Sequence, residues 1–413
     1  MPTGNCSLLW PIRAQTIVRH TYMAVTVIII SGLLFVVYAG LIIFYRQGWV
    51  KMPLFHPGDQ PPSPTTKITV VIPARNEEEN IGSCLESVCS QSYPSHLFEV
   101  IVVDDHSVDN TATVILSFSD RNVSLISLGD FTGGNTLNSY KKKAIEIAIQ
   151  HSTGELIVTT DADCQVPLNW LQTIAQFYEQ HNAALIAAPV VIDCDFNFLQ
   201  MFQAVDFMTL QGITGASVYR NMHSMCNGAN LAYEKKAFME VNGFKGIDSI
   251  ASGDDMLLMH KIAKKYPRRV QFLKSKQAIV HTQPVQSLKA FFNQRIRWAS
   301  KADKYDDKSI LPVLVLVYVF NVLLLILPFM QLFSSSSIAV FDYSFSIIQC
   351  WLILLTLKTM VELFFLYPVA CLFSKQRLLW LFPFMQPFHI VYTVIAGWLG
   401  KFGSYQWKGR EVK

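Results

Sequence analysis

The chain has 413 residues, of which 51% are hydrophobic and 15% are charged, and its formal net charge is +4. This length allows a full catalytic domain with additional elements, and the apolar fraction is high for a water-soluble enzyme. The small net charge, and the lack of Lys/Arg blocks mixed with aromatic residues, exclude nucleic acid as an expected partner.

The first long apolar segment, residues 23–45, carries no charge. It is longer than the roughly 20 residues that a helix needs to cross a bilayer, and no clear small-residue cleavage site accompanies it. We therefore expect a transmembrane anchor, with a tail before it (1–22) and a turn-rich linker after it (46–66).

The region between the first and second apolar spans contains nearly all of the charged residues, and it repeats a strand–helix pattern. Predicted strands begin at Ile68, Phe98, Val123, Glu155 and Ala183. Strands without polar alternation, separated by helices, are typical of a parallel sheet that is covered on both faces. We predict a doubly wound α/β domain over residues 67–285.

Acidic residues follow several of these strands. Asp104 and Asp105 end one strand, Asp161 and Asp163 end another, and the loop PARNEEE (73–79) follows a third. Because such sheets bind ligands at the carboxyl ends of their strands, we expect these acids around one crevice. Side chains two apart in an extended segment point the same way, so the D-x-D pair can share a cation. An isolated D-x-D is more often a polar turn, but the number of acids at this edge favours the cation.

Carboxylate oxygens suit Mg²⁺ or Mn²⁺, and no His or Cys spacing indicates Zn²⁺. Mg²⁺ commonly shares its coordination with phosphate oxygens, which points to a nucleoside diphosphate. Neither GxxxxGK[ST] nor a GxGxxG after the first strand is present, so a P-loop nucleotidase and a Rossmann dehydrogenase lose support. The eight cysteines form no CxxC pair, which suits reduced thiols in a cytosolic domain.

Residues 286–306 predict an amphipathic helix at the membrane interface. Its apolar side chains recur along one helical stripe, and Gln294, Arg297 and Trp298 share the adjoining face. An arginine beside a tryptophan can clamp phosphate and stack on a sugar ring. The same pair can instead anchor the helix among lipid headgroups, and the residues alone leave both uses open.

Three further apolar segments follow this helix, at 310–333, 343–373 and 378–400. The first two are expected to cross the membrane, and the last is expected to cross it or to lie in the interface, before a basic tail (401–413). Lys358 and Glu362, four residues apart, can neutralise each other inside a helix bundle; otherwise the helix is shorter and both lie near an interface. The positive-inside rule favours a cytosolic α/β domain in a multi-pass protein of the inner cell membrane, although both tails depart from that rule.

Together these residues resemble the membrane-anchored, inverting glycosyltransferases of family 2. The motifs that carry the resemblance are VVIPARNEEENI, VVDDHSVDNT, KKKAIEIAI, DAD, GDDMLL and QRIRW. The resemblance covers the soluble domain and the order of the spans. It implies a Rossmann-like domain of GT-A type between N- and C-terminal transmembrane helices, with a nucleotide sugar as donor, and we expect a UDP-sugar.

The resemblance also implies roles for single residues. The residues expected to bind the nucleotide sugar are Pro73, Arg75, Glu77, Asp104 or Asp105, Lys141 and Asp161. Asp161 and Asp163 are the expected metal ligands, and Asp255 is the expected catalytic base. Asp254 is assigned to the same catalytic pair, although many relatives have Glu in this pair. Because Lys141 belongs to a run of three lysines, a solvated helix face is an equal alternative.

The acceptor side is the least defined by the sequence. Asn227 and Gly228 resemble the acceptor loop of the family or are turn residues, and Gln294, Arg297 and Trp298 are expected near acceptor and diphosphate. A membrane lipid and a growing polysaccharide are both open as acceptors. A processive polysaccharide synthase would need an accessory subunit, because four spans are few for a channel. A catalytically silent membrane scaffold is the alternative of another class.

Overall fold

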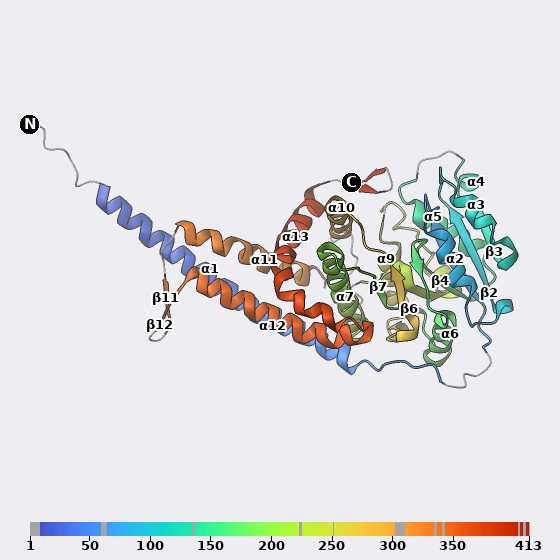
Figure 1. Ribbon diagram of the computed structural model, residues 1–413, viewed down its shortest axis with the longest axis horizontal. Helices are drawn as coiled ribbons and strands as arrows, with labels where there is room; N and C mark the ends of the chain where they lie inside the picture. The colour runs from blue at the N-terminus through green and yellow to red at the C-terminus, as the bar shows by residue number, and fades with distance from the viewer. Residues whose placement is uncertain are drawn as a thin grey trace, which may run out of the picture.

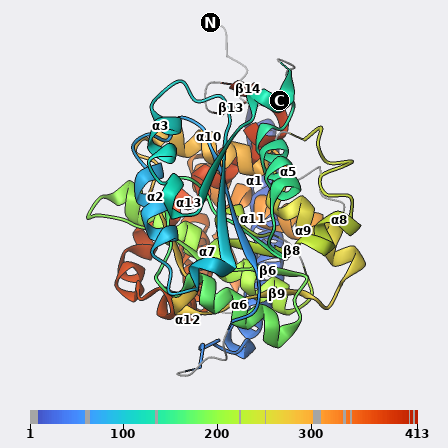
Figure 2. The same cartoon turned by 90° about the vertical axis from the view of Figure 1, so that its right-hand side faces the viewer.

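The structure is a computed structural model, and it describes residues 9–58, 64–133, 137–222, 225–250, 252–301, 310–333, 337–340, 343–403, 405–407 and 410–412. Figure 1 shows an α/β domain at one end of an elongated molecule and long helices at the other. Figure 2 looks onto the α/β domain along the length of the molecule, with the long helix α1 behind it.

The α/β domain contains a seven-stranded sheet in the order β3-β2-β1-β4-β8-β6-β9. Its strands are β1 (Ile68–Ala74), β2 (Phe98–Asp104), β3 (Val123–Ser127), β4 (Leu156–Thr159), β6 (Leu185–Ala187), β8 (Leu231–Glu234) and β9 (Val270–Phe272). Strands β1 to β4 pair in parallel, whereas β8 runs antiparallel to both β4 and β6. The prediction of an all-parallel sheet is therefore wrong at β8, which lies in a segment expected to be a loop.

A second, three-stranded sheet contains β5 (Cys164–Gln165), β10 (Val280–Thr282) and β7 (Val190–Ile192). The single strand predicted from Ala183 divides into β6 in the large sheet and β7 in the small one. Pro189 separates the two strands, and a proline cannot donate a ladder hydrogen bond. Strand β5 of the small sheet begins directly after Asp163.

Helices cover both faces of the large sheet (Figures 1 and 2). They are α2 (Ile81–Cys89), α3 (Thr111–Leu116), α4 (Gly129–Thr132), α5 (Tyr140–His151), α6 (Trp170–His181), α8 (Lys235–Glu240) and α9 (Asp254–Lys265). Successive residues of β1 enter different apolar cores, since Val70 and Ile72 pack on one face and Val71 on the other. All three are fully buried, and each such side chain contributes roughly 1.5–3 kcal/mol by leaving water.

Four helices of the described chain are long and apolar enough to cross a membrane. They are α1 (Leu9–Lys51), α11 (Ile310–Phe333), α12 (Ile347–Phe373) and α13 (Phe382–Phe402), the last preceded by the 3₁₀ turn Gln376–Leu381. Helix α1 extends beyond both ends of the expected 23–45 span. Short hairpins pair β11 (Ser337–Val340) with β12 (Tyr343–Ser346), and β13 (Tyr405–Trp407) with β14 (Arg410–Val412).

Lys358 and Glu362 of α12 lie buried within the helix bundle, which agrees with the first of the two alternatives predicted for them. Lys358 Nζ lies 2.7 Å from Glu362 Oε1 and 2.8 Å from Gln386 Oε1. Gln386 donates to Glu362 Oε2 at 2.5 Å, and the Tyr38 hydroxyl also donates to Glu362. All four side chains are buried. The pair therefore joins α1, α12 and α13 through neutralised charge, which is how membrane interiors accommodate ionisable residues.

Helix α7 (Phe198–Tyr219) connects the α/β domain to these helices by close packing of small residues. A Cβ on Gly212 would lie 2.7 Å from Val369 of α12, and a Cβ on Gly215 would lie 2.8 Å from Trp49 of α1. A Cβ on Gly48 of α1 would likewise lie 3.0 Å from the carbonyl oxygen of Ala216 in α7. Glycines at these points let three helices approach closely.

Candidate active site

One pocket opens at the carboxyl ends of the central strands and extends to α7 and α10 (Leu288–Ala299). The predicted site residues that line it are Pro73, Arg75, Glu77, Asp105, Lys141, Asp161, Asp163, Asn227, Gly228, Asp254, Asp255, Gln294, Arg297 and Trp298. Asp104 does not line the pocket; its carboxylate is buried and accepts from the Ser107 amide at 3.3 Å. Of the two acids that end β2, Asp105 is therefore the one that faces the pocket.

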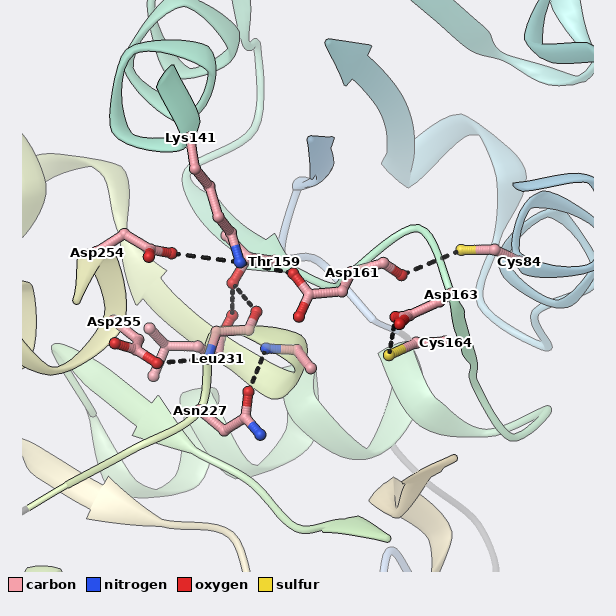
Figure 3. Close-up of polar contacts among 12 residues, drawn as sticks. Cys84, Lys141, Thr159, Asp161, Asp163, Cys164, Asn227, Leu231, Asp254 and Asp255 are labelled. Atoms are coloured by element: carbon pink, nitrogen blue, oxygen red, sulfur yellow. Dashed lines mark hydrogen bonds and ion pairs between the residues drawn. The ribbon is translucent and has the colours of Figure 1, made fainter. Parts of the chain in front are cut away.

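Lys141 lies between two of the acidic motifs (Figure 3). It sits in the first turn of α5, and its Nζ is 2.6 Å from Asp161 Oδ1 and 3.5 Å from Asp254 Oδ2. Burial lowers the pKa of Lys141, but the two carboxylates outweigh burial and raise that pKa above its ordinary value. The lysine is therefore charged, and it draws the D-x-D segment and the Gly-Asp-Asp segment to the same point. The solvated-face alternative for Lys141 is wrong.

Asp254 and Asp255 occupy the first turn of α9, after Gly253 in the left-handed region at φ 80°. Burial raises the pKa of Asp254, but the neighbouring charges of Lys141 and Lys301 lower it. Together they outweigh burial, and the pKa of Asp254 lies below its ordinary value. Asp255 Oδ2 accepts from the Gly228 amide at 3.2 Å, and its Oδ1 accepts from the neighbouring Met256 amide at 2.7 Å. Asp254 is thus held by Lys141, while backbone amides orient Asp255.

The turn at Asn227 and Gly228 fits closely against these carboxylates. A Cβ on Gly228 would lie 3.3 Å from Asp254 Oδ2 and 3.5 Å from Lys141 Nζ. Thr159 of β4 donates to the Gly228 carbonyl at 2.8 Å, and Asn227 Oδ1 accepts from the Ala229 amide at 2.9 Å. The two residues both line the pocket and form a turn, so the two alternatives drawn from the sequence coexist.

Asp161 and Asp163 both face the pocket from the segment between β4 and β5. Asp161 Oδ1 is engaged by Lys141, and Asp163 Oδ1 is 3.5 Å from the Cys164 thiol. No group of three or more His, Cys, Asp or Glu side chains in the described ranges is placed to hold a metal ion. Two carboxylates nevertheless fit Mg²⁺ or Mn²⁺, which take remaining oxygens from water and phosphate. The donor set fits a cation that binds together with a phosphorylated ligand.

Helix α10 forms the opposite wall, and its buried residue Arg295 fixes it from behind. Arg295 forms an ion pair with Asp206 of α7 at 2.7 Å and donates to Gln294 Oε1 at 2.8 Å. Its guanidinium carbon lies 4.3 Å from the centre of the Trp298 ring. Asp206 also accepts from the Tyr392 hydroxyl of α13 at 2.5 Å. Two pocket residues, Gln294 and Trp298, are therefore held by a buried charge cluster that includes a residue of the apolar helix α13.

The apolar stripe of α10 packs against protein where the sequence predicted a membrane interface. Phe291 is fully buried, and its ring lies 5.3 Å from Tyr392 and 5.8 Å from both Phe388 and Phe202. Leu288, at the beginning of the same stripe, is 55% exposed. The periodicity identified the apolar face correctly, but helices α13 and α7 cover most of it.

Two models of known protein families match long ranges of the sequence. Residues 69–241 match the family model "Glycosyl transferase family 2", and residues 156–398, more than half of the chain, match "Glycosyl transferase family group 2". The chain belongs to the family-2 glycosyltransferases. The predicted fold class, an α/β domain of GT-A type between N- and C-terminal apolar helices, is confirmed.

Curated relatives of this family-2 glycosyltransferase match only part of its sequence. Glycosyltransferase AglE of Haloferax volcanii is 34% identical over 111 residues, which are 25% of this chain and 33% of AglE. Beta-monoglucosyldiacylglycerol synthase of Synechocystis sp. is 26% identical over 123 residues, 29% of this chain and 25% of that enzyme. The match thus spans a third of AglE and a quarter of the Synechocystis enzyme.

A solved structure supports the fold over nearly the whole chain. The mannosyltransferase PcManGT from Pyrobaculum calidifontis, in complex with GDP-Man and Mn²⁺, aligns with a TM-score of 0.53 and 18% identity. The alignment covers 90% of this chain and 99% of that one. At this identity the likeness establishes the fold of the glycosyltransferase.

Several pocket residues were missed by reasoning from the sequence. Lys301 lines the pocket three residues after Trp298, so the helical spacing that grouped Gln294 with Arg297 and Trp298 could have included it. Burial is the main influence that lowers the pKa of Lys301. Gln203 and Phe207 also line the pocket, from α7. Helix α7 contains no motif that resembles a site, and the only signal in its sequence was polar residues such as Gln203 and Asp206 among apolar ones.

Proposed function

We propose that this glycosyltransferase moves a sugar from a nucleotide sugar to a hydroxyl group of a membrane-associated acceptor, with inversion at the sugar carbon. One observation carries the proposal. Asp255, oriented by two backbone amides, faces the same pocket as the Asp161 and Asp163 carboxylates and the cations Lys141 and Lys301. This shared lining supports the proposal, because a proton acceptor and groups able to stabilise a departing diphosphate would then surround one space.

The donor nucleotide would lie against the ends of β1 and β2, with a UDP-sugar as the proposed donor. Pro73, Arg75, Glu77 and Asp105 line this end of the pocket. Arg75 Nη1 donates to the Asp105 carbonyl at 2.7 Å and lies 3.6 Å from its carboxylate. These contacts join the two strand ends, so the nucleotide would enter a site whose shape is already set.

Positive charge for the diphosphate would come from two sources. Asp161 and Asp163 would hold Mg²⁺ or Mn²⁺, which neutralises phosphate charge when it is bound. Lys141, Arg297 and Lys301 line the pocket and would supply further hydrogen-bond donors and positive charge to the diphosphate. Because the ion pair with Asp161 and Asp254 keeps Lys141 charged, this lysine can contribute before any ligand arrives.

Asp255 is proposed as the general base. Its carboxylate takes the proton of the acceptor hydroxyl while that oxygen attacks the anomeric carbon from the face opposite the diphosphate. The bond between the anomeric carbon and the diphosphate oxygen breaks, and its electron pair leaves with the nucleoside diphosphate. Asp254 stays paired with Lys141 throughout, so it acts on position and charge and leaves the proton transfer to Asp255.

A lipid or a growing polysaccharide is the proposed acceptor, at the cytosolic face of the inner cell membrane. Helices α7 and α10 form the acceptor wall, and both pack against apolar helices that are suited to a bilayer. The name of the Synechocystis relative describes a glycosylated lipid, which supports a lipid acceptor here. The second candidate, a processive polysaccharide synthase, would require an accessory subunit.

The test is release of nucleoside diphosphate by the purified full-length protein over a panel of UDP- and GDP-sugars. Release should depend on Mg²⁺ or Mn²⁺ and should fall on the order of 100-fold or more in Asp255→Asn, while nucleotide binding remains. Asp120→Asn, an exposed acid outside the pocket, is the matched control. No release from any donor in membranes that contain native acceptors would overturn the proposal in favour of a scaffold.

A further inference from the structure

Three successive lysines at the beginning of α5 have three different environments. Lys141 lies in the pocket between Asp161 and Asp254. Lys143 is partly exposed and pairs with Glu146 one turn later, at 3.0 Å. Lys142 is only 2% exposed, and it extends away from the pocket into the chain that precedes α9. A lysine is rarely buried to this extent unless its ammonium has partners.

The partners of Lys142 are all backbone carbonyls of one loop. Its Nζ donates to the carbonyl oxygens of Ile247 at 2.8 Å, Ile250 at 2.6 Å and Ser252 at 3.1 Å. An ammonium group has three N–H donors, so the three acceptors use its full capacity. Hydrogen bonds from a charged donor are also stronger than those from a neutral one.

This loop leads directly into the acidic motif of the pocket. Ser252 is followed by Gly253, which adopts φ 80°, and then by Asp254 and Asp255. At the other end of the loop, Lys261 of α9 donates to the carbonyl of Lys245 at 2.9 Å and to that of Gly243. The loop is therefore fastened near both ends by lysines, and the one nearer the pocket comes from α5.

We infer that Lys142 is a positioning residue for the proposed reaction, because its ammonium holds the backbone at Ile247, Ile250 and Ser252 and thereby places Asp254 and Asp255 in the pocket. The inference rests on the proposed role of Asp255 as base. Lys141 and Lys142 are adjacent in the same helix, so α5 would fix the acidic motif twice. One lysine does so through the Asp254 carboxylate, the other through the backbone that precedes it.

The charge state of Lys142 gives this role a measurable signature. Burial is the largest influence and lowers the pKa of Lys142, Asp254 raises it and Lys301 lowers it, with Asp255 and Asp248 raising it slightly. Overall the pKa of Lys142 is lowered from 10.5 to about 8. Loss of the proton leaves a neutral amine with two donors for three carbonyls. The loop should therefore loosen as the pH rises through this value.

The first experiment compares Lys142→Met with Lys143→Met in the full-length protein. In Lys142→Met, kcat for diphosphate release should fall on the order of 100-fold, because misplacing a reacting group by about 1 Å has an effect of this size. Nucleotide affinity should stay unchanged, since the donor end of the pocket is not touched, and amide exchange in residues 241–253 should accelerate. Lys143→Met should change none of these quantities.

A second variant keeps the inference testable if Lys142→Met folds poorly. The kcat of the wild type should fall as the pH rises above about 8, and this alkaline limb should be absent in Lys142→Arg, because arginine stays protonated. Between that pH and 10.5 the unfolded chain keeps the Lys142 proton that the folded chain has lost, so the contribution of Lys142 alone to the free energy of unfolding should rise. Thermal unfolding measured at each pH separates the loss of activity from alkaline unfolding of the whole chain.

The results separate the two proposals. Unchanged kcat and exchange in Lys142→Met, or an alkaline limb that persists in Lys142→Arg, would overturn the role of Lys142. If the wild type releases diphosphate from no donor, the proposed function fails. The amide exchange of residues 241–253, compared between wild type and Lys142→Met, still decides in that case whether Lys142 holds the loop.

Discussion

The two walls of the pocket are stabilised from different parts of the molecule. On the wall that we call the donor wall, Lys141 pairs with Asp161 and Asp254, and Gly228 lies close to Lys141 and Asp254; all four residues belong to the α/β domain. On the acceptor wall, α10 is fastened through Asp206 to α7 and to the apolar helix α13. The donor wall should thus keep its shape whatever surrounds the long helices, whereas the acceptor wall should depend on the position of α13.

The largest effect should come from removing the cation at the centre of the donor wall. Lys141→Met leaves Asp161 and Asp254 facing each other without a positive charge between them. We expect kcat for diphosphate release to fall on the order of 100- to 1,000-fold, as when one preorganised donor is lost from an active site. Steady-state kinetics over the donor panel measures this. A fall of less than tenfold would show that the donor wall functions without Lys141.

Filling the space at Gly228 should have the next largest effect. Gly228→Val places two extra methyl groups next to the Cβ position that already lies 3.3 Å from Asp254 Oδ2. Overpacking of this kind costs about 1–3 kcal/mol and should displace the carboxylates, so we expect kcat to fall roughly 10- to 100-fold. Gly82→Ala is the control, since its Cβ would meet only Val114 at an ordinary 3.5 Å. Equal kinetics for the two variants would refute the close fit.

On the acceptor wall, Arg295→Met should act on stability and acceptor use together. It leaves Asp206 buried without its ion pair, which typically costs about 3–5 kcal/mol. The KM for acceptor should rise while donor affinity is unchanged, because Gln294 and Trp298 lose their support. Thermal unfolding and acceptor kinetics measure the two effects.

A double variant separates the ion pair from general damage in the core. Asp206→Asn combined with Arg295→Met leaves no lone buried charge. The double variant should therefore be less destabilised than Arg295→Met alone. A double variant whose cost equals the sum of the two single variants would contradict the proposed coupling of α10 to α7.

The smallest effect should come from removing the hydrogen bond between Tyr392 of α13 and Asp206 of α7. Tyr392→Phe removes only the hydroxyl that donates to Asp206, a hydrogen bond to a charged group worth about 1.5–3 kcal/mol. The KM for acceptor should rise a few-fold, and more in detergent than in bilayers, while release from the donor alone is unaffected. Tyr367→Phe, 61% exposed on α12, is the control. If Tyr392→Phe changed diphosphate release from the donor alone and left the KM for acceptor unchanged, α13 would support the donor wall and not the acceptor wall.

The sequence predicted those features that depend on neighbouring residues or on simple periodicity. Apolar composition alone identifies α11 and α12, and the rule for strand ends brought Asp161 and Asp163 to the same edge as Asp105. Strand β8 was missed because it is only four residues long and pairs antiparallel with strands from far earlier in the chain. Short strands of this kind are stabilised by their partners more than by their own residues.

Contacts between distant segments account for the rest. Nothing in the run of three lysines distinguishes Lys142, since its acceptors are carbonyls about one hundred residues later. No role for Arg295 within QRIRW was predicted, because its partner Asp206 lies on α7 and the hydroxyl that donates to Asp206 belongs to Tyr392 of α13. Periodicity marks which face of a helix is apolar, but not whether lipid or another helix covers that face.

Helix α7 has a practical consequence for anyone who wishes to obtain the α/β domain by itself. One side of α7 supplies Gln203 and Phe207 to the pocket, and Gly212 and Gly215 bring its other side against α12 and α1. Removing α1 and cutting the chain before α11 would strip α7 of these neighbours and expose an apolar surface directly behind the pocket. We therefore expect excised domains to aggregate or to lose acceptor binding, and purification in lipid nanodiscs to preserve both walls.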